Sequence, residues 1–317
     1  MDFVIFILAM GALIVGADFI VNQSEKIAKH FNLSEFVIGA TIIALGTSLP
    51  EMAASIAATF NNKLDMAISN AIGSNIFNIS LVLAIIFLIS RNIKPTRDFF
   101  SKDTTWALVP IMLFILMSID GVIGKLDAIL LLTLMFAYML FLLNDTHKEK
   151  GLPPLNDEED QKSDQKFNWI TTIALLSIGF IFVISGAHFA VESASGIAHN
   201  FGVSEWVIGI VLVSFGTSLP ELVISVSAAL KGKVDMAIGN IIGSNLANIT
   251  LVVGLSALVK ELPISLATHA FDISAMVVAT IMLIYITANK LYNRPAGISL
   301  LILLILFLDH TVKYKMG

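Results

Sequence analysis

The chain has 317 residues, of which 56% are hydrophobic and only 14% are charged, and its mean hydropathy is +0.87. These values exclude a soluble globular protein, because too little polar surface exists to cover a particle in water. The net charge of -5 includes no basic field for nucleic acid, and the absence of cysteine excludes disulfides, thiolate metal sites and cysteine nucleophiles. What remains is a protein that crosses a lipid bilayer several times.

Apolar runs separated by short polar breaks can each cross a bilayer, whose hydrocarbon core takes about 20 helical residues. We predict ten spans in an all-α membrane protein, near residues 3–21, 36–60, 66–89, 105–119, 126–143, 169–191, 206–230, 236–258, 268–287 and 296–308. The fourth and tenth of these runs are short. Helices are expected because the chain lacks the alternating segments of a membrane barrel.

The basic residues predict how the chain is oriented. Of the 19 Lys and Arg residues, 14 lie in the first, third, fifth, seventh and ninth connections, and the opposite face has 5. Because basic loops stay in the cytoplasm, we expect both termini outside the cell and a multi-pass protein of the cell membrane. The connection 144–168, with its Pro153-Pro154 pair and acidic run 157–160, is then a cytoplasmic linker.

An internal repeat organises the chain. Segments of the first half recur in the second at a constant offset: Gly46-Thr47-Ser48-Leu49-Pro50-Glu51 returns at 216–221, and Gly73-Ser74-Asn75 with Asn78 returns at 243–248. Each copy contains five predicted spans. Since five is odd, the second copy should enter the membrane inverted, as in secondary transporters. The expected divisions are a first repeat over 1–143, the linker over 144–168 and an inverted repeat over 169–317.

The repeated motif should break the second helix of each half. Pro50 and Pro220 lack an N–H, and Gly46 and Gly216 permit unusual backbone angles, so we expect each helix to kink or unwind there. Irregular backbone at membrane depth survives where it lines a cavity or coordinates an ion.

Two carboxylates near the middle of these apolar runs predict a cationic substrate. An unpaired Glu51 or Glu221 in a membrane would cost several kcal/mol, so each needs a cation or a proton. Carboxylates with hydroxyl, amide and carbonyl oxygens suit Ca²⁺ and Na⁺. Because an empty, doubly charged site would be costly to carry across the membrane, only loaded forms should cross, which favours antiport.

At these motifs the sequence resembles the cation/calcium antiporters and, within them, the prokaryotic type of sodium/calcium exchanger. The two Gly-Thr-Ser-Leu-Pro-Glu segments and the two Gly-Ser-Asn segments carry the resemblance. It implies a core of the second, third, seventh and eighth helices around four cation sites, across which the first and sixth helices slide. It further implies three Na⁺ exchanged for one Ca²⁺ by alternating access, with no cofactor and no obligate protein partner.

The resemblance also implies the ligands. Ca²⁺ would be held by Thr47, Glu51, Thr217 and Glu221. The inner Na⁺ site would use Ser48, Ser74 and the carbonyl of Ala44; the outer Na⁺ site would use Ser218, Ser244 and the carbonyl of Ser214; and the middle site would be flanked by Asn78 and Asn248.

Asn248 departs from part of the family, in which potassium-dependent relatives carry Asp at this position. An amide supplies no third charge for an additional monovalent ion, so we expect exchange without K⁺. Both halves lack the Gly-Asn-Ala-Thr-Glu pattern typical of proton/calcium exchangers, which makes H⁺ the alternative coupling ion. A passive cation channel is a further alternative, although a channel normally places its filter on an oligomer axis or in a pore loop. No catalytic triad or phosphate loop appears, so an enzyme is not expected.

Overall fold

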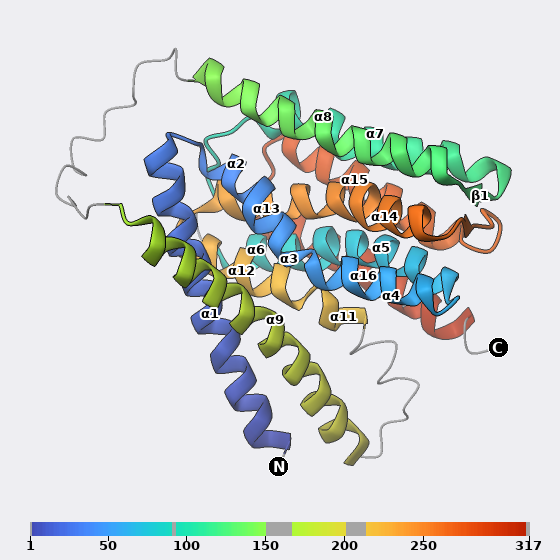
Figure 1. Ribbon diagram of the computed structural model, residues 1–317, viewed down its shortest axis with the longest axis horizontal. Coiled ribbons are helices and arrows are strands. Elements are labelled where there is room, and N and C mark those ends of the chain that lie inside the picture. Colours follow the sequence, from blue (N-terminus) through green and yellow to red (C-terminus); the bar gives the residue numbers. More distant parts are fainter. Residues whose placement is uncertain (1, 91–92, 150–166, 201–213, 315–317) are drawn as a thin grey trace.

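The computed structural model describes residues 2–90, 93–149, 167–200 and 214–314, and nearly all of them are helical (Figure 1). Within these ranges eight helical segments are long and apolar enough to cross a membrane, or nine when one bent pair is counted as a span. The eight are α1 (Asp2–Phe31), α5–η2–α6 (Leu64–Ile89), α7 (Phe99–Met117), α8 (Lys125–Glu149), α9 (Trp169–Asn200), α13–η5–α14 (Val234–Val259), α15 (Ala270–Ala288) and α16 (Arg294–Tyr314).

The bent pair is the second predicted span. It consists of α2 (Glu35–Ile38), the π-helical turn η1 (Gly39–Ile43), α3 (Ala44–Thr47) and α4 (Leu49–Phe60), and its two halves meet at 40°. Its counterpart is α11 (Ser214–Thr217) followed by α12 (Leu219–Leu230). The first part of the predicted span 206–230 lies outside the described residues, so the predicted count of ten is neither reached nor excluded.

The repeat seen in the sequence is a repeat of helices. Each 12-residue helix that carries a glutamate, α4 or α12, is followed by a 14-residue helix, α5 (Leu64–Phe77) or α13 (Val234–Ala247). Each of the latter continues into a π-helical turn, η2 (Asn78–Leu83) or η5 (Asn248–Val252), and then into α6 (Ala84–Ile89) or α14 (Val253–Val259). A π-turn in an α-helix often marks a functional site.

The central layer contains the repeated motifs of the two halves. In their most apolar stretches, Leu64–Ile89 and Val234–Val259 are 72% and 78% buried, against 28% for the spans that contain α7, α8, α9 and α16. Glycine lets the central helices approach closely: a Cβ atom on Gly39 of η1 would lie 2.2 Å from the carbonyl oxygen of Met236 in α13. A Cβ atom on Gly239 would lie 2.6 Å from the carbonyl oxygen of Phe36. The broken helix of the first half is therefore packed tightly against α13 of the second half.

The two longest helices, α1 and α9, cross at one side of this core and extend beyond it (Figure 1). Glycines again set their separation: a Cβ atom on Gly16 would lie 2.8 Å from the carbonyl oxygen of Gly179, and one on Gly186 would lie 3.0 Å from that of Ala9. Small residues commonly allow such close packing between helices in membranes.

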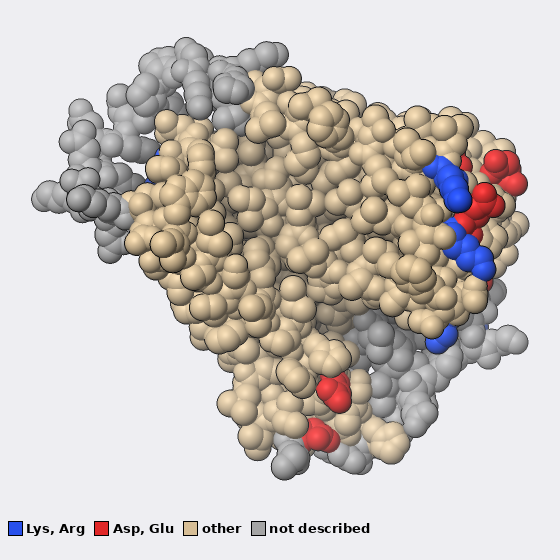
Figure 2. All heavy atoms as spheres, in the orientation of Figure 1, with Lys and Arg blue, Asp and Glu red and all other residues tan. Residues whose placement is uncertain are grey.

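The remaining elements complete the periphery. Helices α7 and α8 lie together along one edge, and α15 and α16 flank the core (Figure 1). A short antiparallel ribbon pairs β1 (Val122–Ile123), in the connection between α7 and α8, with β2 (Leu262–Pro263), in the connection between α14 and α15. The 3-10 turn η3 (Ser118–Asp120) precedes β1. On the face shown in Figure 2, charged side chains occupy the ends and a broad surface between them is uncharged, as a lipid-facing surface requires.

Several predicted boundaries are wrong. The runs 3–21 and 169–191 belong to helices that continue to Phe31 and Asn200. The polar extension of α1 is amphipathic: Gln23 and Ile27 are buried, while Glu25 and Lys29 form an ion pair of 3.0 Å. The fourth and tenth spans are likewise longer than predicted. Helix α8 continues to Glu149, past the start predicted for the linker at 144, and residues 150–166 of that linker lie outside the described part of the chain.

Candidate ion-binding site

The two glutamates of the repeated motif lie at the starts of helices in the middle of the structure. Glu51 is in the first turn of α4 and Glu221 is in the first turn of α12, and each residue is fully buried. The predicted breaks are confirmed: Ser48 and Ser218 leave helical geometry, and a proline follows two residues later in each case. A helix N-terminus carries partial positive charge and so favours a carboxylate.

Around the glutamates lie buried oxygen atoms that have no hydrogen-bond partner. Unpartnered buried polar atoms are rare in folded proteins, and each requires a physical reason. The set consists of both carboxylate oxygens of Glu51, Oε2 of Glu221, the hydroxyls of Ser74, Thr217 and Ser218, and Oδ1 of Asn78 and Asn248. All of these residues were predicted as ligands from the sequence, and all of these atoms can coordinate a hard cation. Their elements contact one another in the central layer.

One group of predicted ligands joins the two halves. The hydroxyl of Ser48 donates to Oε1 of Glu221 at 3.5 Å. The hydroxyl of Thr47 lies 3.3 Å from that of Ser244, and the Ser244 hydroxyl donates to the carbonyl of Ala44 at 3.5 Å. That carbonyl also accepts from the Thr47 hydroxyl and the Ser48 amide.

The hydrogen bonds group the serines differently from the family resemblance. The family resemblance groups Ser74 with Ala44 and Ser48, and Ser244 with Ser218 and Ser214. In the structure Ser244 donates to the carbonyl of Ala44, because α13 crosses α3 where Gly243 has no side chain; a Cβ atom there would lie 2.7 Å from the Cβ atom of Ala44. Helix α5, which carries Ser74, instead contacts α11, which begins at Ser214.

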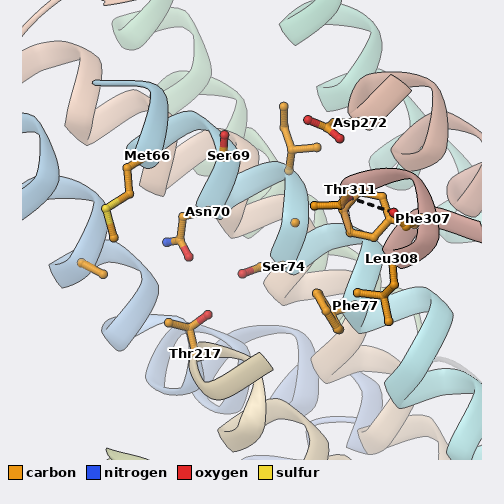
Figure 3. Close-up of a pocket in the computed structure, with 13 residues that line it drawn as sticks. Met66, Ser69, Asn70, Ser74, Phe77, Thr217, Asp272, Phe307, Leu308 and Thr311 are labelled. Carbon is orange, nitrogen blue, oxygen red and sulfur yellow. Dashed lines mark hydrogen bonds between the residues drawn. The ribbon is translucent and has the colours of Figure 1, made fainter. Parts of the chain in front are cut away.

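A cavity of about 220 Å³ borders two other predicted ligands, Ser74 and Thr217. It lies between α5, α15 and α16. Figure 3 shows Asn70, Ser74 and Thr217 around a common space, with Asp272 and Thr311 on another side of it. The unpartnered hydroxyls of Ser74 and Thr217 therefore border an open space. Thr47 is instead held by hydrogen bonds across the halves.

A layer of residues behind the glutamates was not predicted from the sequence. Asn70 donates to the carbonyl of Glu51 at 3.3 Å and to the hydroxyl of Ser55 at 2.9 Å. Asn240 donates to the hydroxyl of Ser225 at 2.9 Å, and its Oδ1 accepts from Thr47 at 3.3 Å. Since 240 − 70 and 225 − 55 both give the repeat offset of 170, comparing the two halves position by position would have found these pairs.

The comparison with known proteins decides the family. The sequence matches the family described as sodium/calcium exchanger protein over residues 1–144 and 171–312. The chain belongs to this family. It is 32% identical to sodium/calcium exchanger MaX1 of Methanosarcina acetivorans over 343 residues, covering 97% of each chain. It is 35% identical to an uncharacterized membrane protein of Methanocaldococcus jannaschii over 301 residues, covering 95% of each chain.

A solved structure of the sodium-calcium exchanger NCX_Mj has the same fold. With 34% identity, the alignment covers 97% of this chain and 98% of that one, with a TM-score of 0.81. That protein was soaked with Na⁺ and Sr²⁺. The resemblance drawn from the repeated motifs is thus confirmed at the level of the family: this chain is a membrane protein of the sodium/calcium exchanger type.

Proposed function

We propose that the protein exchanges Na⁺ for Ca²⁺ across the membrane by alternating access. The observation that carries this proposal is the set of eight buried oxygen atoms with no hydrogen-bond partner around Glu51 and Glu221. Two carboxylates supply a charge of −2 at most, which one Ca²⁺ neutralises, and the neutral oxygens complete a hard coordination shell for Ca²⁺ or Na⁺. Membership of the exchanger family supports the choice of these two ions.

The geometry supports the following ligand sets. Glu51, Glu221, Thr47 and Thr217 bind Ca²⁺. One Na⁺ binds among Glu221, Ser48, Ser244 and the carbonyl of Ala44, which lie together in the structure. A second Na⁺ binds among Glu51, Ser74, Ser218 and the carbonyl of Ser214, because Ser74 and Ser218 have free buried hydroxyls and α5 contacts α11. Asn78 and Asn248 present amide oxygens to the middle site.

The transport cycle is electrogenic and independent of K⁺. Three Na⁺ in exchange for one Ca²⁺ move one net positive charge per cycle. The residues at 78 and 248 are uncharged amides, so the site has no third carboxylate to hold K⁺. Helices α1 and α9, which lie beside the core, slide across it to expose the site to each side in turn.

The proposed topology has ten spans in two inverted repeats, 1–143 and 169–317, joined by a cytoplasmic segment within 144–168. The span 206–230 then crosses the membrane as the counterpart of the bent span 36–60. Both termini lie outside the cell, and the protein resides in the cell membrane. The excess of Lys and Arg in alternate connections supports this orientation.

Isotopic Ca²⁺ uptake into sealed proteoliposomes separates the proposal from its alternatives. Vesicles loaded with Na⁺ and diluted into Na⁺-free medium should accumulate Ca²⁺, and vesicles with equal Na⁺ on both sides should not. Uptake driven by a pH gradient without Na⁺ would instead establish a proton/calcium antiporter. Uptake that depends on Ca²⁺ and voltage but on no second ion would establish a channel. Either result would overturn the proposed exchange.

A further inference from the structure

Four asparagines connect the two halves directly behind the proposed middle site. The side-chain nitrogen of Asn75 donates to the backbone carbonyl of Asn245 at 3.2 Å, and that of Asn245 donates to the backbone carbonyl of Asn75 at 3.4 Å. The side-chain nitrogen of Asn248 donates to Oδ1 of Asn75 at 3.1 Å, and that of Asn78 donates to Oδ1 of Asn245 at 3.0 Å. The arrangement is symmetric, and every one of these bonds crosses from one half to the other.

These bonds determine which end of each amide faces the site. A backbone carbonyl can only accept, so the nitrogen of Asn75 must point to Asn245 and its oxygen must point to Asn248. The group that meets this oxygen must be a donor, which fixes the nitrogen of Asn248. Oδ1 of Asn248 is then the free end, and it is buried without a partner. The same reasoning leaves Oδ1 of Asn78 free.

We propose that Asn75 and Asn245 are positioning residues, which hold the amides of Asn248 and Asn78 with their oxygens toward the transported cation. A primary amide that rotates by half a turn would present its N–H groups to the cation instead, which repels it. Each half thereby orients the ligand of the other: Asn75 acts on Asn248, and Asn245 acts on Asn78. This inference rests on the proposed function, because it takes the middle site to be a cation site.

A double-mutant cycle tests the proposal, with Ca²⁺ affinity as the readout. In the full-length protein in detergent, Asn75→Leu removes the group that orients Asn248. Mutation of a residue that orients a metal ligand typically weakens metal affinity by about 10- to 100-fold. We expect a loss of that size for Ca²⁺ binding in the Asn75→Leu protein, measured as isotopic binding or as the Ca²⁺-induced rise in unfolding temperature.

The second half of the cycle replaces the amide of Asn248 with a carboxylate, whose two terminal atoms are both oxygen. In an Asn248→Asp background both ends of the side chain are oxygen, so no orientation can be lost, and adding Asn75→Leu should cost little or no further affinity. The matched control is Asn78→Asp, because the side chain of Asn78 is hydrogen-bonded to Asn245 and not to the side chain of Asn75. In that background Asn75→Leu should still cause its full loss of Ca²⁺ affinity. The mirror pair, Asn245→Leu with Asn78→Asp, should behave in the same way.

If Asn75→Leu reduced Ca²⁺ affinity equally in both aspartate backgrounds, Asn75 would contribute only packing and would not orient Asn248. That result would overturn the proposal. Unchanged Ca²⁺ affinity in the single Asn75→Leu variant would overturn it as well, and this arm decides the question if an aspartate variant binds no Ca²⁺. Failure of the proposed function is a different outcome, since the wild-type protein itself would then bind no Ca²⁺.

Discussion

At the scale of single residues, the two glutamates dominate the energetics of the site. Each is fully buried, and the free hydroxyl and amide oxygens nearby add no charge. An unpaired buried charge costs several kcal/mol even after relaxation of the protein. In the proposed function a bound cation neutralises the carboxylates, and both are needed to neutralise Ca²⁺.

We expect Glu51→Gln or Glu221→Gln to abolish Ca²⁺ transport without unfolding the protein. Glutamine keeps the shape of the side chain, but the bound Ca²⁺ then keeps one uncompensated charge in a medium of low polarity. A penalty of about 3 kcal/mol or more corresponds to a loss of Ca²⁺ affinity of over about 100-fold. Isotopic uptake by purified variants of normal elution volume measures this.

The matched control is Glu261→Gln, which removes a carboxylate from an exposed loop and should transport as the wild type does. If a well-folded Glu51 or Glu221 variant took up Ca²⁺ at the wild-type rate, the assignment of the site would be wrong.

The glutamates could be predicted from the sequence because a carboxylate within a long apolar run is costly unless it binds a cation or a proton, and because the repeat supplies each with the same neighbours. Which of Ser74 and Ser244 lies beside Ala44 could not be predicted from the sequence. It depends on which helix crosses which, and in the structure this is decided by the close contact at Gly243 between α13 and α3. The orientation of the Asn78 and Asn248 amides likewise depends on partners in the other half.

At the scale of helices, ion pairs attach α1 and α2 to the turn between α12 and α13. Lys231 pairs with Asp18 of α1, and Lys233 pairs with Glu25 of α1 at 2.9 Å and with Glu35 of α2 at 2.8 Å. Partial burial lowers the pKa of Lys233, but hydrogen bonds to Glu35 and Glu25 outweigh this and raise its pKa above the usual value. Lys233 therefore remains charged at neutral pH and holds α1 to the core.

The repeat provides no equivalent of the Lys231 pair for α9. The residues at the repeat offset from Lys231 and Asp18 are Asn61 and His188, which are not an ammonium and a carboxylate. Among the described residues, the ion pair between Lys231 and Asp18 thus attaches α1 to the core at the proposed cytoplasmic face without a counterpart on α9. The difference should favour the state in which the cytoplasmic passage is closed.

Lys231→Gln should shift this balance. A partly exposed ion pair contributes about 0.2–1 kcal/mol, so the population open to the cytoplasm should rise by no more than about fivefold. The chain has no cysteine, and a single Ala44→Cys residue can report through its rate of reaction with an impermeant thiol reagent applied from the cytoplasmic side. Reversing the pair with Asp18→Lys and Lys231→Asp should restore the slow rate. An unchanged rate in Lys231→Gln would show that the pair does not bias the conformation.

The close packing of the central helices predicts a large effect of a single methyl group. In Gly39→Ala the new Cβ atom would lie 2.2 Å from the carbonyl oxygen of Met236, and backbone cannot move aside cheaply. Overpacking of this kind costs about 1–3 kcal/mol, so we expect the unfolding temperature in detergent to fall by about 1.5–4.5 °C. Gly11→Ala is the control, because nothing lies within 4 Å of its new Cβ atom. Equal unfolding temperatures for the two variants would contradict the packing described here.

The number and order of the central helices could be predicted, since apolar runs and proline breaks are local features. The lengths of α1 and α9 could not, because residues 22–31 and 192–200 look like polar loops until their buried faces are known. Amphipathic extensions of this kind are stabilised by tertiary packing more than by their own composition.

At the scale of the whole molecule, the proposed stoichiometry predicts a current. One net positive charge per cycle is worth about 2.3 kcal/mol per 100 mV. With Na⁺ outside and Ca²⁺ inside, an inside-negative potential should accelerate Ca²⁺ export, and adding K⁺ at clamped voltage should change nothing. Recordings from proteoliposomes on a solid-supported membrane can measure both effects. Voltage-independent exchange would refute the stoichiometry, and an absolute requirement for K⁺ would refute the role given to Asn248.

The central claim is that Na⁺ and Ca²⁺ occupy one site built around Glu51 and Glu221, so that each excludes the other. Equilibrium binding of isotopic Ca²⁺ to the purified protein, titrated with Na⁺ at constant ionic strength, tests this most directly. We predict that Na⁺ displaces all bound Ca²⁺ with a dependence steeper than first order, and that Glu51→Gln and Glu221→Gln proteins bind no Ca²⁺ at the same concentration. Ca²⁺ that stays bound at saturating Na⁺, or that binds equally well without either carboxylate, would contradict the account.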